Sequence, residues 1–239
     1  MRNKNKYLFV FIFSLIAGGG VFLLSLCGNK IVTTFSESRP ILERKTIIID
    51  AGHGGVDGGA TSCTGVLESD MNLDIALKLN DLCHLLGIKT IMIRTTDHSV
   101  HTQEGSIAAK KVSDLKERVR VVNETEDGIL ISIHQNYFSD SKYYGAQTFY
   151  ADTEGSRDLA CQLQLNISNY LIPENKRTAK RASGIYLMDH INTCGVLIEC
   201  GFVSNPEENA KLLTEAYQKN LCCVIAGTIS MYIKSSEVS

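Results

Sequence analysis

Apolar residues recur along the chain at two spacings, which alternate between residues 44 and 235. Short runs rich in β-branched residues predict strands, and apolar residues three or four positions apart predict helices. The expected strands are 46–50, 89–94, 128–133, 145–150 and 195–199. The expected helices are 70–86, 113–123, 159–171 and, as one helix or two, 209–233. This alternation predicts an α/β domain over residues 44–235 with three layers, αβα, and a mostly parallel central sheet.

The first 27 residues follow a different pattern, because they are apolar on every face. Residues 7–27 are almost wholly apolar, follow a short basic segment, and as a helix would span about 31 Å, one bilayer core. The basic flank predicts that the domain lies outside the cytoplasm. We expect residues 1–27 to be a signal anchor, or alternatively a cleaved signal peptide, and the polar residues 28–43 to be a stalk.

Composition argues against a nucleic-acid partner and predicts the oxidation state of the cysteines. The net charge is −2, so nothing predicts the electrostatic capture of a nucleic acid. The eight cysteines are scattered without a Cys-x-x-Cys pair, and a domain of this size needs no disulfide framework. We expect mostly free, buried thiols, with one disulfide left open.

Polar residues that could take part in catalysis or metal binding stand where three predicted strands end. Strand 46–50 leads through a glycine-rich turn to His53, strand 128–133 is followed by His134, and strand 195–199 ends at Glu199. If these strands are parallel, their carboxyl ends share one edge of the sheet, which is where active sites of such folds form.

Several familiar motifs are absent from the chain. The glycines after residue 50 fail the dinucleotide pattern at Asp57, and the chain has no phosphate-binding Gly-Lys-Ser/Thr sequence. It also lacks the Gly-x-Ser-x-Gly nucleophile motif and the His-Glu-x-x-His metal motif. Any metal site must therefore be assembled from distant segments.

Four residues at loops or strand ends remain as candidates: His53, Glu68, His134 and Glu199. Three nitrogen or oxygen ligands are the usual plan of a catalytic zinc site, and a fourth carboxylate can serve as general base. Spacing alone leaves alternatives open. Glu68 could be a helix N-terminal carboxylate, His134 a satisfied strand-end histidine, and Glu199 the partner of a lysine.

Longer stretches of sequence resemble a known family. The run Ile-Ile-Ile-Asp-Ala-Gly-His-Gly-Gly-Val-Asp-Gly-Gly-Ala at 47–60 resembles the opening signature of the zinc-dependent N-acetylmuramoyl-L-alanine amidases (amidase type 3). The resemblance covers about 190 residues and continues through Glu68 and the segments 93–97, 115–123, 132–136 and 197–205. Segments 145–150 and 177–180 further resemble the sporulation-associated branch, whose members strip peptides from spore-cortex glycan so that muramic lactam can form.

The resemblance implies a role for each of the four candidates. His53, Glu68 and His134 would be ligands of Zn²⁺, and Glu199 would be the catalytic carboxylate. The substrate would be the peptidoglycan glycan strand with its stem peptide, cleaved between the lactyl group of N-acetylmuramic acid and L-alanine. The protein would act outside the cytoplasm, membrane-anchored or secreted, and in the sporulation branch at the forespore envelope.

Other polar residues are weaker candidates. Asn136 is predicted to hydrogen-bond peptide or sugar, and Arg118 either meets a substrate carboxylate or forms a salt bridge on a helix surface. Arg94 ends a strand and is expected to be a structural clamp. For the basic stretch Lys176, Arg177, Lys180 and Arg181, a solvated loop is favoured over glycan or peptide binding.

Three alternatives to a self-sufficient metalloamidase stay open. One is a cysteine hydrolase using Cys200 or Cys63 with His134, although Cys200 should face the opposite side of the sheet from Glu199. The second is a non-catalytic wall-binding module. The third is a metal site completed or stabilised by an accessory protein.

Overall fold

The computed structural model describes residues 45–236. The expected membrane segment at 1–27 and stalk at 28–43 lie outside these residues, so both stay predictions. Within residues 45–236, no helix combines the length and the apolar character needed to cross a membrane.

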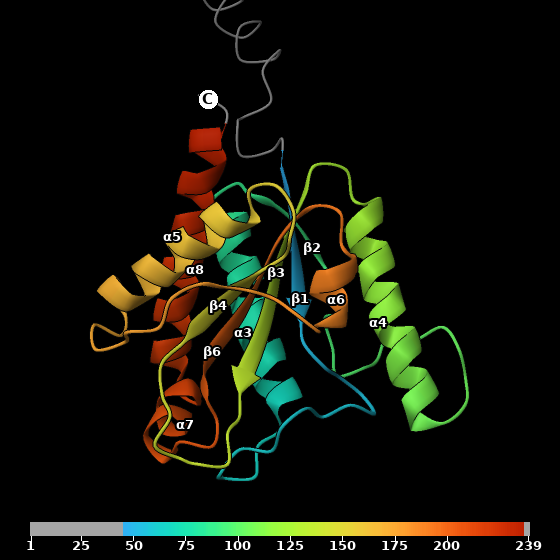
Figure 1. Cartoon of the computed structure of the whole chain (residues 1–239), viewed down its shortest axis with the longest axis horizontal. Coiled ribbons are helices and arrows are strands. Elements are labelled where there is room, and N and C mark those ends of the chain that lie inside the picture. The colour runs from blue at the N-terminus through green and yellow to red at the C-terminus, as the bar shows by residue number, and fades with distance from the viewer. Residues whose placement is uncertain (1–44, 237–239) are drawn as a thin grey trace, which may run out of the picture. The chain divides into compact units, whose positions relative to one another are not determined.

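A six-stranded sheet forms the centre of the fold, in the order β2-β1-β3-β6-β4-β5 (Figure 1). The strands are β1 (Thr46–Ala51), β2 (Lys89–Met92), β3 (Gly128–Asn136), β4 (Gln147–Tyr150), β5 (Lys180–Arg181) and β6 (Cys194–Phe202). Strands β2, β1, β3 and β6 are parallel, β4 runs antiparallel to β6, and β5 is parallel to β4. The predicted mostly parallel sheet is therefore confirmed.

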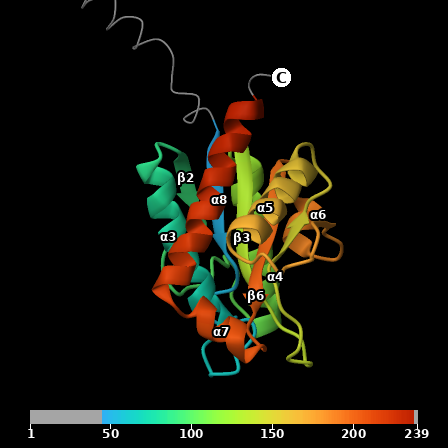
Figure 2. The same cartoon turned by 90° about the vertical axis from the view of Figure 1, so that its left-hand side faces the viewer.

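Helices cover both faces of the sheet (Figures 1 and 2). They are α3 (Glu68–Leu85), α4 (Ile107–Glu124), α5 (Ser156–Tyr170), α6 (Tyr186–His190), α7 (Pro206–Leu212) and α8 (Glu215–Ser236). Helices α3, α5 and α8 lie on one face, and α4 and α6 on the other. This arrangement confirms the predicted αβα layers.

Strand β1 shows how the sequence builds two cores. Successive side chains of a strand point to opposite faces of the sheet. Ile47 and Ile49 accordingly pack in the cluster under α3, α5 and α8. Ile48 packs in the cluster under α4 and α6. All three are fully buried, as expected for a strand covered on both faces.

The structure also contains elements that the pattern did not predict. Strand β5 has two exposed residues and α6 has five residues, so neither is long enough to show a period. Helix α4 begins at Ile107, six residues earlier than expected, behind an N-cap in which Ser106 accepts a hydrogen bond from Ala109 N. Its first turns are exposed, including the apolar Ile107 and Val112, so their apolar residues do not mark a buried helix face. The segment 209–233 belongs to two helices, α7 and α8.

Candidate metal centre and active site

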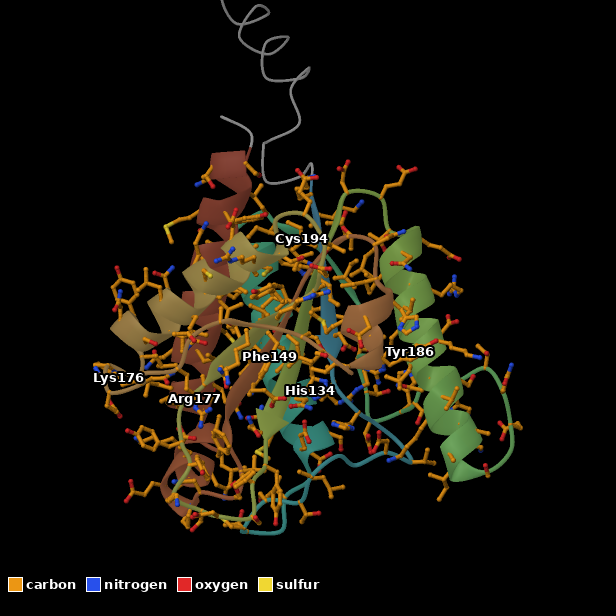
Figure 3. The ribbon with its side chains drawn as sticks, viewed as in Figure 1. His134, Phe149, Lys176, Arg177, Tyr186 and Cys194 are labelled. Atoms are coloured by element: carbon orange, nitrogen blue, oxygen red, sulfur yellow. The ribbon has the colours of Figure 1, made fainter. Side chains whose placement is uncertain are left out.

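Three side chains from distant segments converge at the carboxyl edge of the sheet. His53 lies in the loop after β1, Glu68 is the first residue of α3, and His134 lies near the end of β3. Oε1 of Glu68 is 3.0 Å from Nδ1 of His134 and 3.3 Å from Nε2 of His53. One ligand atom of each residue lies within 4.8 Å of the others. Figure 3 shows His134 at this end of the sheet.

This donor set fits a small divalent ion. Tetrahedral zinc, with bonds of about 2.0–2.2 Å to nitrogen and oxygen, keeps its ligand atoms about 3.3 Å apart. The two contacts made by Glu68 are close to that separation. Two imidazoles and one carboxylate are also the chemistry that zinc accepts in catalytic sites.

Glu68 is held in its ionised form. Its carboxylate is buried and accepts hydrogen bonds from the backbone N–H groups of Ala60 and Gln135. Burial by itself would raise the pKa of Glu68, but the hydrogen bonds and charges of His134 and His53 hold that pKa far below its ordinary value. Glu68 is thus both a helix N-terminal carboxylate and the common partner of the two histidines.

The loop that carries His53 is fixed by its neighbours. His53 has a φ of 61°, in the left-handed region that non-glycine residues occupy at a cost of about 1–3 kcal/mol. Nη2 of Arg118 donates to the carbonyl oxygen of His53 over 2.7 Å, and Nδ1 of His53 lies 3.0 Å from Oδ2 of Asp57. Burial would lower the pKa of His53, but Glu68 and Asp57 raise it to about 9.

Glycine at position 52 leaves room for the second histidine. A Cβ atom at Gly52 would lie 2.2 Å from Nε2 of His134, a separation that real contacts do not reach. The ring of His134 therefore lies directly against the backbone of the β1 loop, 5.0 Å between centroids from the ring of His53.

Glu199 lies beside this group on the neighbouring strand. It is the register partner of His134 across the parallel pair β3 and β6, so the two residues are about 4.8 Å apart at the backbone. Oε2 of Glu199 is buried and has no hydrogen-bond partner within residues 45–236. Burial, aided by the charge of Glu68, raises the pKa of Glu199 to about 7. No lysine pairs with Glu199 in the described part of the chain, which removes that alternative.

A cleft of about 330 Å³ joins these groups to solvent. Its floor is the edge of the sheet, and α4 and the segment leading into α6 form its walls. Lining side chains include His53, His134, Glu199, Lys111 and Leu187. The unpartnered carboxylate of Glu199 and the two histidines therefore face the same accessible space.

Arg118 lies elsewhere than expected. It is only 2% exposed, and its guanidinium group donates to the carboxylates of Asp50 and Asp114 and to two backbone carbonyl oxygens. The predicted helix-surface salt bridge is corrected to a buried ion pair. Four of its five N–H donors are used in these contacts, and Arg118 also lines the cleft described above, so its contact with a substrate carboxylate stays a prediction.

The structure confirms the predicted role of Arg94 and leaves the predicted role of Asn136 untested. Arg94 is 1% exposed and donates to four backbone carbonyl oxygens, which confirms the structural clamp. Asn136 ends β3 with a partly exposed side chain. It is not among the residues that line the cleft, and its contact with substrate stays a prediction.

Asp57 and Lys111 were not identified from the sequence. Asp57 bridges Nδ1 of His53 and, over 2.7 Å, Nζ of Lys111 on α4. The available signal was a carboxylate four residues after a candidate ligand histidine. Lys111 gave no signal, because its partner lies on a different element.

The cysteines that the structure describes do not form a nucleophilic site. Cys200 is fully buried on the face opposite Glu199, as predicted, and burial raises the pKa of its thiol well above the ordinary value. Cys63 is exposed, and no hydrogen bond joins it to His134 within residues 45–236. The seven described cysteines are free, but Cys63, Cys161 and Cys223 are exposed rather than buried.

Comparisons with known proteins agree with this geometry. A family model described as N-acetylmuramoyl-L-alanine amidase matches residues 47–231. The germination-specific N-acetylmuramoyl-L-alanine amidase of Bacillus subtilis (strain 168) is 37% identical over 198 residues, which is 80% of this chain and 81% of that protein.

Solved structures show the same similarity. The CwlD amidase from Clostridioides difficile, in complex with the GerS lipoprotein, matches with a TM-score of 0.77 and 38% identity, covering 80% of this chain and 99% of that one. An N-acetylmuramoyl-L-alanine amidase from Clostridium difficile 630 matches with a TM-score of 0.69 and 32% identity, covering 81% and 98%. The chain therefore belongs to the family of N-acetylmuramoyl-L-alanine amidases, which hydrolyse the amide bond between N-acetylmuramic acid and L-alanine in peptidoglycan.

Proposed function

We propose that this amidase depends on zinc held by His53, Glu68 and His134, and that Glu199 is its catalytic carboxylate. The observation that carries the proposal is the convergence of three ligand atoms within 4.8 Å beside a buried carboxylate oxygen without a partner. A module that only bound the cell wall would have no use for this combination.

The residues divide the chemistry between them. Zinc supplies Lewis-acid polarisation of the scissile carbonyl group and of a water molecule. Glu199 accepts a proton from the attacking water and delivers it to the departing nitrogen of L-alanine, which leaves poorly without one. Burial raises the pKa of Glu199 above its ordinary value, and a raised pKa favours delivery of the proton as well as its acceptance.

The biological setting proposed is the spore cortex, outside the cytoplasm. The support is the similarity to a germination-specific amidase together with the branch-like segments 145–150 and 177–180. We further propose that residues 1–27 attach the enzyme to a membrane as an anchor or direct its secretion. We also propose that an accessory protein completes or stabilises the metal site. The support is that the similar CwlD amidase was solved in complex with the GerS lipoprotein.

The test is digestion of purified peptidoglycan by the full-length chain, with mass spectrometry of the products and metal analysis of the protein. We expect release of whole stem peptides from muramic acid, about one zinc per chain, loss of activity with a chelator and recovery with Zn²⁺. Activity that survives chelation but disappears with a thiol reagent would contradict the proposal. The matched control is Cys63→Ser, which should leave activity unchanged.

A further inference from the structure

Arg177 stands apart from the other basic residues of the stretch at 176–181. Lys176, Lys180 and Arg181 are exposed, whereas Arg177 is half-buried. Its Nε donates to the carbonyl oxygen of Tyr144 over 2.8 Å, and its guanidinium lies 4.6 Å from the centre of the Phe202 ring. The solvated loop expected for this stretch therefore does not describe Arg177.

The contacts of Arg177 lead to the active site. Its Nη1 donates over 3.1 Å to Oε1 of Gln147, and Gln147 is the register partner of Glu199 across strands β4 and β6. Directly opposed residues in such a pair have Cβ atoms about 4.5–5.5 Å apart on the same face. The guanidinium is thus one side chain removed from the catalytic carboxylate. Figure 3 shows Arg177 and His134 toward the same end of the sheet.

The guanidinium group of Arg177 has N–H donors that its contacts with the described residues do not use. Of its five N–H donors, one is used by Tyr144 and one by Gln147, so three have no acceptor among the described residues. These include both donors of Nη2, and with the remaining one on Nη1 they form a planar fork. Such a fork matches the two oxygens of a carboxylate.

No protein carboxylate fills that fork. Arg177 takes part in no ion pair within residues 45–236, whereas Arg181 pairs with Asp152 over 2.6 Å. The charge of Arg177 favours the ionised form of Glu208, although burial raises the pKa of Glu208 overall. Both oxygens of Glu208 are already committed, one to the N–H of Gly145 and the other to that of Phe202. Arg177 is therefore a cation held in place by Tyr144 and Gln147, with no ion-pair partner among residues 45–236.

We propose that Arg177 binds a carboxylate of the stem peptide and so selects peptides that carry a free acid close to the scissile bond. The inference rests on the proposed function and names a substrate determinant for it. The glycan offers no free carboxylate at the cleaved lactyl group, because that group forms the amide. The peptide beyond L-alanine does carry free carboxylates, so a bidentate cation that is separated from Glu199 by the side chain of Gln147 would orient the peptide side of the bond.

The test compares two disaccharide-tripeptide muropeptides, one with free carboxylates and the other with its carboxylates converted to amides. For the full-length zinc-loaded wild type, we expect amidation to raise KM about tenfold and to change kcat less than twofold. Arg177→Gln should raise KM for the free acid to the value for the amide and abolish the discrimination. Arg177→Lys should retain part of this discrimination, because lysine keeps the positive charge but lacks the planar fork of N–H donors. The control Arg181→Gln should discriminate as the wild type does.

A binding measurement separates recognition from catalysis. The Glu199→Gln protein should bind the acidic muropeptide about ten times more tightly than the amidated one, and the added Arg177→Gln substitution should remove that difference. A wild type that cleaves both muropeptides with equal KM overturns the role of Arg177 and leaves the amidase intact. If Arg177→Gln lowers kcat for both muropeptides equally and keeps the wild-type preference for the free acid, Arg177 is only a loop tether. A wild type that cleaves neither muropeptide nor peptidoglycan overturns the proposed function itself.

Discussion

His53 and Asp57 are joined by a hydrogen bond of 3.0 Å between Nδ1 and Oδ2, four residues apart in one loop. A carboxylate on one ring nitrogen fixes the tautomer and leaves the other nitrogen free as a metal ligand. Nε2 of His53 accordingly faces Glu68. Because His53 has a left-handed backbone conformation, this bond also helps to hold the ring in its direction.

Replacement of Asp57 by asparagine should weaken metal binding without unfolding the domain. Loss of such a supporting carboxylate typically lowers metal affinity by about 10–100-fold, and we expect a change in that range. Competition with a chelator of known zinc affinity measures it. Asp97→Asn is the control, since Asp97 bonds the same loop through Gly55 N but contacts no candidate ligand. Equal zinc affinities of wild type and Asp57→Asn would remove Asp57 from the site.

A single methyl group at position 52 should disable the site. In Gly52→Ala, the new Cβ would overlap the His134 ring, with Nε2 and Cε1 at 2.2 and 2.3 Å, so the ring must leave its place. We expect loss of zinc and of most activity with the helical circular dichroism retained. Gly227→Ala is the matched control, because nothing lies within 4 Å of its Cβ position. A Gly52→Ala protein that keeps full zinc content would show that His134 is not a ligand.

Substitution of Glu199 by glutamine should separate metal binding from turnover. The amide cannot transfer protons, so kcat should fall by a factor of about 10² or more, while zinc content stays at the wild-type level. Stability should be unchanged or higher, because a buried carboxylate oxygen without a partner carries an uncompensated desolvation cost. Steady-state kinetics and thermal melting check both parts. Turnover close to wild type would exclude Glu199 from the chemistry.

The sequence predicted the parts of the site that depend on the ends of strands. Strands β1, β3 and β6 are long, apolar and parallel, so their carboxyl ends must share an edge. The residues at those ends could therefore be grouped before any coordinates: His53, His134 and Glu199. Glu68 was a candidate from its loop position, but only the family resemblance grouped it with the two histidines as a ligand, because a helix start carries no information about which strand end it faces.

The missed features depend on contacts between elements. Arg118 occupies a helix that looks polar and exposed in sequence, and only the packing of α4 on the sheet brings it to Asp50. Gln147 lies beside Glu199 because β4 runs antiparallel to β6, a direction that periodicity does not encode. The role of Arg177 follows from that pairing. Strand order and register decide such neighbours, and both are properties of the tertiary fold.

The buried pair of Asp50 and Arg118 should make the stability of the domain depend on pH. Both residues are almost fully buried, and Asp50 also accepts a hydrogen bond of 2.6 Å from Oγ of Ser132. Burial would raise the pKa of Asp50, but Arg118 and Ser132 outweigh it and lower that pKa below its ordinary value. The folded state therefore binds this proton less readily than the unfolded chain, whose aspartates titrate near about pH 3.9.

It follows that the stabilisation from Asp50 is fully present above that pH and is lost as the pH falls through the lower, folded pKa. Asp50→Asn leaves the buried Arg118 charge with only one of its two carboxylate partners, Asp114, so we expect a loss of about 2 kcal/mol in the free energy of unfolding at pH 7. The difference from wild type should begin to narrow below about pH 4, because the unfolded wild-type chain then takes up a proton that the folded Asp50 does not yet bind. Urea unfolding at pH 7, 5 and 3.5 measures this. Asp140→Asn, at an exposed pair with Lys142, should lose little at any pH. A deficit for Asp50→Asn that stays constant down to pH 3.5 would mean that the pair does not control the acid stability of the domain.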